Sequence, residues 1–173
     1  MTIWADADSL QAEVRRLVCA RAGREAEAAA ASGREPRYRA VFIASRMPPI
    51  REGPGVEAES VDAGPGAADD RIVERACAGD LAVTRDIPLA ERLADKGLRV
   101  LNDRGDLLTA ENARERRSLR DRAAELRALG LAPESPRRSA WGPRELKAFA
   151  DALDRELAKA AGRPGRAADI ERA

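Results

Sequence analysis

Acidic residues follow two short apolar segments of this chain, and their types and positions could bind a metal ion. Asp6 and Asp8 come directly after the run 1–5, and Asp86 comes after the run 81–84. In an open parallel sheet, ligands bind beyond the carboxyl ends of the strands, where the strand order reverses. Hard oxygen donors that meet there suit Mg²⁺ or Mn²⁺. We therefore expect a divalent metal site at the ends of these two segments.

A second acidic pair, Asp69 and Asp70, lies in a segment with helical spacing. Neighbouring side chains on a helix differ in direction by roughly 100°, so only one of the two can face a given pocket. Asp69 shares the helical spacing of Ile72 and Val73, and we expect it to face inward. The predicted metal ligands are Asp6, Asp8, Asp69 and Asp86.

Two of these aspartates also have a structural interpretation. Asp8 stands three positions before Gln11, and an N-cap residue is often followed at this spacing by a Glu or Gln. Asp86 stands just before Pro88, which suits the first turn of a helix. Both interpretations stay open for both residues.

The expected chemistry is phosphodiester hydrolysis. Carboxylates packed together repel one another unless a divalent cation neutralises them or their pKa values shift. A bound metal ion lowers the pKa of a coordinated water and offsets the charge that develops on a phosphate. The chain has no histidine, so hydrolysis would depend on carboxylates, metal and water. We predict Asp6 and Asp86 as the catalytic pair that holds the metal directly.

The charges are unevenly distributed along the chain. Residues 34–51 contain five arginines and one glutamate, whereas residues 52–80 contain eight acids and two arginines. A basic lip beside an acidic pocket would suit a polyanion, although a mosaic of surface charge would look the same in sequence. Guanidinium groups match phosphate geometry, and hydroxyl groups can orient a phosphate or a water. The candidate substrate-binding residues are Ser9, Arg46, Thr84, Arg85 and Arg104.

Strand-like runs alternate with helical ones, which predicts a parallel sheet with crossover helices. We expect a single three-layer α/β/α domain over residues 1–160, with a mainly parallel sheet of about five strands. The expected strands are 2–5, 38–44, 56–61, 81–84 and 98–101, and the expected helices between them are 9–31, one after Gly66 and 88–96. The C-terminal part should hold a long helix 109–130, a linker 131–143, a docking helix 143–160 and a flexible tail 161–173. Thr109 should cap the long helix, which has an apolar stripe of Leu119, Ala123, Leu126 and Leu129. The docking helix has Leu146, Phe149, Leu153 and Leu157 on one face.

Length and composition place limits on the class of protein. A chain of 173 residues can bury a core within one domain. Cys19 and Cys77 lie far apart inside expected helices and are interpreted as small buried residues of a reduced protein. The sequence has neither a signal-peptide pattern nor an apolar run of about 20 residues, so we expect a cytoplasmic protein without membrane contact.

Several segments, taken together, resemble the YaiI/YqxD family. They keep their order and spacing from residue 2 to about 158. The matching segments are Asp6-Ala7-Asp8, Ala68-Asp69-Asp70-Arg71-Ile72-Val73, Asp86-Ile87-Pro88-Leu89-Ala90, Leu101-Asn102-Asp103-Arg104-Gly105, Glu111-Asn112-Ala113-Arg114-Glu115-Arg116 and Phe149-Ala150-Asp151-Ala152-Leu153-Asp154.

The resemblance implies a fold similar to the PIN-like nucleases, with Mg²⁺ or Mn²⁺ at acidic strand ends and RNA or another nucleic acid as partner. Matched residue by residue, the acidic set falls on Asp6, Asp8, Asp69 and Asp86. The chain departs from the family pattern near the expected pocket. Ser9-Leu10-Gln11 stands in place of Ala-Cys-Pro, Ser45-Arg46 in place of Asn-Gln, and Asp103 in place of Pro.

Two other functions compete with a nuclease. One is a binding module for nucleic acid or protein that keeps the fold without turnover. The other is a phosphatase similar to the haloacid dehalogenases, in which Asp6 and Asp8 would supply the nucleophile and the acid. That mechanism needs a Ser or Thr motif before its paired acids, whereas here Asp69 and Asp70 precede Thr84. The order of these residues therefore argues against the phosphatase.

Overall fold

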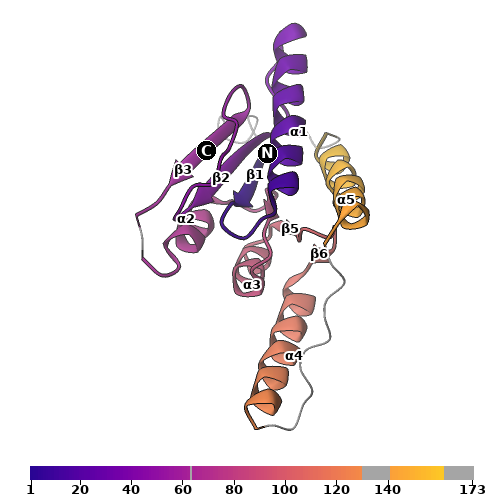
Figure 1. The fold of residues 1–173 in the computed structure, drawn as a ribbon. Coiled ribbons are helices and arrows are strands. Elements are labelled where there is room, and N and C mark those ends of the chain that lie inside the picture. Colours follow the sequence, from indigo (N-terminus) through magenta and orange to yellow (C-terminus); the bar gives the residue numbers. More distant parts are fainter. Residues whose placement is uncertain (63, 130–140, 162–173) are drawn as a thin grey trace, which may run out of the picture.

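The structure is a computed structural model that describes residues 1–62, 64–129 and 141–161. Six strands and five helices lie in these ranges (Figure 1). In chain order they are β1 (Thr2–Asp6), α1 (Ala12–Ala31), β2 (Arg39–Ala44), β3 (Val56–Ser60), α2 (Ala67–Arg75), β4 (Leu81–Val83), α3 (Ile87–Asp95), β5 (Arg99–Leu101), β6 (Leu107–Leu108), α4 (Ala110–Ala128) and α5 (Pro143–Ala161).

The strands form one sheet in the order β3-β2-β1-β4-β5-β6. All neighbours are parallel except β5 and β6, which pair antiparallel. The chain builds outward from β1 to β3 on one side and from β4 to β6 on the other. The strand order therefore reverses between β1 and β4, and the crevice beyond their carboxyl ends is where such sheets bind ligands.

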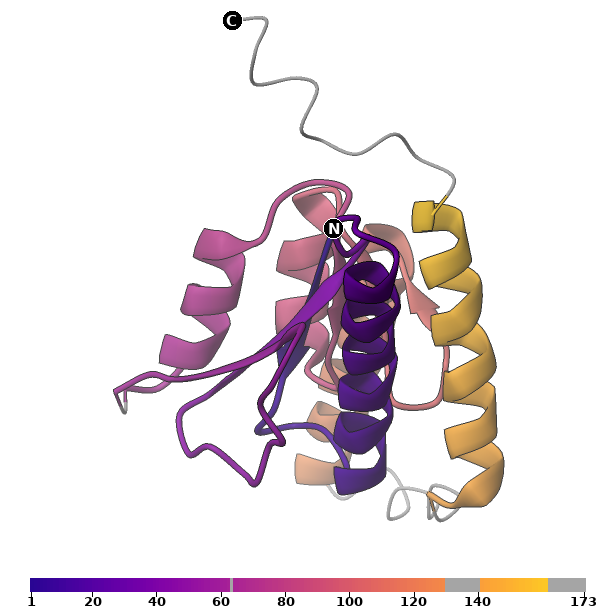
Figure 2. The same ribbon diagram turned by 90° about the horizontal axis from the view of Figure 1, so that it is seen from above.

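Helices cover both faces of the sheet, which confirms the predicted three layers. Alternate residues of a strand point to opposite faces. In β1, Ile3 and Ala5 accordingly pack in the cluster with α1 and α5, whereas Trp4 packs in the cluster with α2 and α3. Seen from above, α1 and α5 run side by side over one face (Figure 2). Phe149 and Leu153 of α5 are fully buried there, as their spacing predicted.

Some expectations about the elements were wrong. The sheet gains a sixth strand, β6, which the sequence analysis did not predict. Helix α1 begins at Ala12, not at residue 9. Cys77 lies beyond the end of α2 and is exposed, while Cys19 is only partly buried on α1. Gly66 precedes α2 with φ of 79°, a left-handed conformation that glycine adopts without strain.

Helix α4 projects away from the sheet and packs against α3 (Figure 1). Its N-terminus has the predicted Thr109 cap, because the Thr109 hydroxyl accepts a hydrogen bond from the backbone N–H of Asn112. The predicted apolar stripe of α4 does not form a core, since Leu119, Leu126 and Leu129 are exposed. Nearly all of the predicted linker 131–143 and of the predicted tail 161–173 lies outside the described residues.

No helix in the described ranges is both long enough and apolar enough to cross a membrane.

Asp80 holds the amino end of β1 against β4. It is buried, and its carboxylate accepts hydrogen bonds from the Thr2 backbone N–H at 2.9 Å, the Trp4 indole at 3.1 Å and the Cys77 backbone N–H at 3.2 Å. These bonds join β1 to the turn that leads into β4, so Asp80 stabilises the contact between two strands.

We predict that Asp80→Ala lowers the free energy of unfolding by about 3 kcal/mol, because a buried indole N–H and two backbone N–H groups lose a charged acceptor. Urea unfolding followed by circular dichroism measures the change. The control is Asp151→Ala, which removes an exposed ion pair with Lys147 on α5 and should cost less than about 1 kcal/mol. Equal losses in the two variants would contradict this role of Asp80.

Candidate active site

The predicted acidic residues gather at one pocket. A pocket of about 270 Å³ opens at the carboxyl edge of the sheet, where the strand order reverses. Asp6 ends β1, Asp86 precedes α3, Asp69 lies in the first turn of α2, and Asp8 lies between β1 and α1. All four aspartates line this pocket. The fold thus brings together residues up to 80 positions apart in sequence.

One buried hydroxyl connects the two aspartates that follow strands. The Thr84 hydroxyl donates a hydrogen bond to Oδ2 of Asp6 at 2.7 Å. The oxygen of the Thr84 hydroxyl also accepts a hydrogen bond from the backbone N–H of Asp86 at 3.0 Å. Thr84 is 1% exposed and is absent from the pocket lining. It is therefore a positioning residue, and the prediction that it touches substrate does not fit its burial.

Asp86 has the structural role that the sequence left open. Its Oδ1 accepts a hydrogen bond from the backbone N–H of Leu89 at 3.0 Å, so it caps α3. Oδ2 of Asp86 accepts no hydrogen bond from the described residues. Because the cap uses one oxygen, the carboxylate can still offer the other to a ligand in the pocket.

The structure does not bear out the cap interpretation that the sequence left open for Asp8. Its Oδ2 accepts hydrogen bonds from the backbone N–H of Ser45 at 2.7 Å and from the Ser45 hydroxyl at 2.8 Å. Gln11 is the N-cap residue of α1, without a side-chain bond to the helix. Asp8 therefore lies beside the end of β2, and α1 begins four positions further along the chain, at Ala12.

Asp69 faces the pocket and Asp70 faces solvent, as predicted. Asp69 is partly buried and lines the pocket. Asp70 is exposed and forms an ion pair with Arg92 at 2.7 Å. The side chain of Asp69 has no hydrogen-bond partner among the described residues, so its charge is uncompensated by direct contacts.

Burial and neighbouring charges raise the pKa of Asp69 to about 6. Desolvation has the largest effect, and the carboxylates of Asp6 and Asp86 add repulsion, while Arg92 opposes the shift. Because Coulomb repulsion falls with distance, the effect of Asp6 and Asp86 on Asp69 follows from their common place in the lining of this pocket.

The donors match a hard divalent cation in type. However, no group of three or more acidic or cysteine side chains in the described ranges is placed to hold a metal ion. Asp6 and Asp8 already accept hydrogen bonds from Thr84 and Ser45. The oxygens without such partners belong to Asp69 and to Oδ2 of Asp86, and these are the atoms that a cation could reach with least rearrangement.

Of the residues predicted to bind substrate, only Ser9 lines the pocket. Its hydroxyl accepts a hydrogen bond from the backbone N–H of Arg85 at 3.1 Å. Arg85 itself forms an ion pair with the buried Asp103 at 3.2 Å, and Arg104 forms one with Glu145 at 3.6 Å. Arg46 is exposed and stands outside the lining. The predicted arginine clamps therefore do not face the pocket.

Most of the predicted basic lip is neutralised locally. Arg34 and Arg37 both form ion pairs with Glu25, which is buried. Their hydrogen bonds hold the pKa of Glu25 well below its usual range, against the opposing effect of burial. Arg39 pairs with Glu57 on the outer strand β3. Only Arg46 and Arg51 of the five have no ion pair among the described residues.

Sequence reasoning missed two contributions to the pocket. Ser45 orients Asp8, and Gly64 and Gly66 bring the backbone before α2 to the rim. The turn Gly64-Pro65-Gly66 stands directly before the helix that contains Asp69, and this was the available signal. The family pattern placed Ser45 near the expected pocket, but its hydrogen bonds to Asp8 were not predicted.

Known proteins match the chain over most of its length. Residues 4–159 match a family model described as an uncharacterised bacterial family, YaiI/YqxD. Relatives named UPF0178 protein are 48% identical over 162 residues in Treponema pallidum and 40% identical over 161 residues in Treponema denticola. These matches cover 92% of this chain in both cases, and 82% and 94% of the two relatives. No solved structure matches significantly.

The family match includes all four aspartates of the pocket, and it confirms the resemblance seen in the sequence. The chain belongs to the YaiI/YqxD family.

Proposed function

We propose that this protein is a metal-dependent nuclease that hydrolyses phosphodiester bonds of RNA at the acidic pocket. The main support is the gathering of Asp6, Asp8, Asp69 and Asp86 around one pocket at the reversal of strand order. The fold alone does not explain four carboxylates in one small pocket. Neutral polar residues could take the same positions and would not repel one another.

The proposed metal ion is Mg²⁺ or Mn²⁺, held by Asp69 and Asp86 with Asp6 close by. Asp6 is 4% exposed and is kept in a fixed orientation by Thr84, so its charge is directed at the pocket. Asp8 adds a further negative charge at the rim. When bound, such an ion lowers the pKa of a water and offsets the charge on the phosphate.

The chain's own residues would orient the substrate. Ser9 presents a hydroxyl at the pocket, and Gly64 and Gly66 let a phosphate approach the backbone before α2. Base stacking would contribute little, because Trp4, Phe42 and Phe149 are buried. Recognition would therefore depend on the phosphate backbone and not on base sequence.

One observation favours the alternative of a binding module without turnover. The described carboxylates do not form a ready coordination group. The two functions differ in what a divalent cation does to the protein, and this difference gives a direct test.

We predict that Asp69→Asn stabilises the metal-free protein by about 1 kcal/mol at pH 7, after allowance for solvent screening. The pKa of Asp69 is raised in the folded state, so the folded protein binds more protons between about pH 4 and 6. Stability is therefore lost as the pH rises through this range. The gain in the variant should disappear below about pH 4, and thermal unfolding at several pH values measures it.

Added Mn²⁺ should make the parent protein more stable than Asp69→Asn. The parent should gain stability on titration with Mn²⁺, because the cation relieves the repulsion at Asp69, and Asp69→Asn should gain less. Asp70→Asn is the matched control, since Asp70 is the exposed neighbour that pairs with Arg92. A parent that Mn²⁺ does not stabilise would favour the binding module.

We predict that Asp86→Asn lowers cleavage of single-stranded RNA in Mn²⁺ by about 100-fold or more, as loss of one electrostatic group commonly does. Asparagine is a good N-cap residue, so α3 should stay capped while the charge at the pocket is lost. The control is Asp95→Asn, at the other end of α3. Cleavage by Asp86→Asn at the parental rate, or no cleavage by the parent, would overturn the nuclease proposal.

A further inference from the structure

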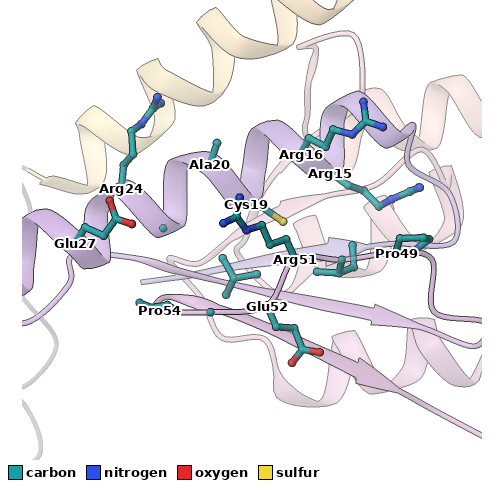
Figure 3. Close-up of a pocket in the computed structure, with 14 residues that line it drawn as sticks. Arg15, Arg16, Cys19, Ala20, Arg24, Glu27, Pro49, Arg51, Glu52 and Pro54 are labelled. Carbon is teal, nitrogen blue, oxygen red and sulfur yellow. The ribbon is translucent and has the colours of Figure 1, made fainter.

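A second pocket is lined by residues 49–54, which follow shortly after Ser45 of the acidic pocket in the chain. Its volume is about 800 Å³, against about 270 Å³ for the acidic pocket. This size falls within the range of small-molecule and cofactor sites. It lies between α1 and the segment 49–54, and reaches Val56 at the start of β3 (Figure 3).

The walls of this pocket are preformed. Gly55 has φ of 75°, and a Cβ there would lie 2.8 Å from the carbonyl oxygen of Ala22 on α1. Only glycine therefore lets the loop end this close to the helix. Gly53 and Val56 also pair across a backbone bridge, and Pro49 and Pro54 restrict the segment between them. The distance between loop and helix is thus fixed before any ligand binds.

The pocket is basic. Arg15, Arg16, Arg24 and Arg51 line it, against Glu27 and Glu52. In the described part of the chain, Arg16, Arg24 and Arg51 form neither ion pairs nor hydrogen bonds through their side chains. Figure 3 shows Arg51 lying against α1 near Cys19, while Glu52 extends to the side away from α1. Guanidinium groups on both α1 and the loop therefore remain available to an anion.

Cys19 does not make this a reactive site. Burial raises the pKa of the Cys19 thiol, although the Arg51 backbone and the charge of Arg15 oppose the shift. A thiol with a raised pKa stays protonated at neutral pH and is a poor nucleophile. The pocket therefore suits binding and not covalent chemistry.

Arg15 connects the two pockets. Its guanidinium lines the basic pocket and donates hydrogen bonds to the backbone carbonyls of Ala7 and Leu10. Those carbonyls flank Asp8 and Ser9, which line the acidic pocket. Ser45 lines the acidic pocket and Pro49 the basic one. These two residues are four positions apart in the chain, so their Cα atoms lie at most about 14 Å apart.

We propose that the basic pocket binds phosphate groups of a single-stranded RNA whose neighbouring phosphodiester lies at the acidic pocket. The inference rests on the proposed nuclease function for its choice of ligand. Arg16 and Arg51 contact the phosphates, Arg15 keeps the β1–α1 loop in place between the two pockets, and the apolar floor formed by Ala20 and Gly23 accommodates the sugar or base. A phosphate backbone is the ligand because the available donors are guanidinium groups without a matching aromatic surface.

The test is RNA binding by the full chain in EDTA, where cleavage cannot interfere. Fluorescence anisotropy of a labelled short single-stranded RNA is measured at several KCl concentrations. The double variant Arg16→Gln/Arg51→Gln should bind roughly five- to tenfold more weakly. The slope of log affinity against log salt should fall in magnitude by about 1.4, which is the loss of two phosphate contacts on a single strand.

The matched control is Arg120→Gln/Arg155→Gln, which removes the same charge from exposed positions on α4 and α5. It should bind with parental affinity and slope. Circular dichroism and thermal unfolding should show all variants folded, because Arg16 and Arg51 make no side-chain bonds within the described ranges that folding would lose.

Unchanged binding by Arg16→Gln/Arg51→Gln, or a parent that does not bind RNA in EDTA, would overturn this inference and leave the nuclease proposal to its own assay. An equal loss in the control pair would also overturn it, since binding would then depend on total charge. RNA binding that depends on Arg16 and Arg51 in a protein that does not cleave RNA would support the pocket and refute the nuclease.

Discussion

The candidate site depends on one buried hydroxyl. Thr84 donates to Asp6 and accepts from the backbone N–H of Asp86, so the ends of β1 and β4 hold their carboxylates in a fixed relation. Because Thr84 is shielded from water, both bonds persist without competition from solvent. Burial has the largest effect on the raised pKa of Asp69, and the repulsion from Asp6 and Asp86 that adds to it follows from this arrangement. The acidic pocket is thus a destabilised part of an otherwise well-packed domain.

Sequence periodicity was sufficient for the sheet and for the pocket's main residues. Apolar runs bounded by turns gave the five parallel strands, and Asp69 was placed inward by its spacing with Ile72. Contacts between distant residues were not predictable. The pairing of Asp8 with Ser45 and of Arg85 with Asp103 joins segments whose proximity only the folded sheet creates. The exposed leucines of α4 show the opposite error, because helical spacing does not reveal whether a partner surface exists.

Charge runs in the sequence were a poor guide to charge on the surface. Residues 34–39 look strongly basic, yet Arg34, Arg37 and Arg39 are each paired with a glutamate. The unpaired arginines that line the basic pocket lie on two different elements, α1 and the loop 45–55. In a chain rich in both acidic and basic residues, most of the described arginines form ion pairs with nearby acids. The unpaired arginines are therefore the more informative guide to where an anion could bind.

The outer strand β3 has a consequence for the behaviour of the protein in concentrated solution. Unpaired edges of sheets can add strands from other molecules and so begin aggregation. On β3, Glu57 pairs with Arg39, and Glu59 pairs with Arg71 and Arg75. An incoming strand would have to displace or bury these charges. The salt bridges that border this edge therefore act against intermolecular β-pairing. They lower the tendency of the protein to aggregate through β3, which the hydrophobic core does not do.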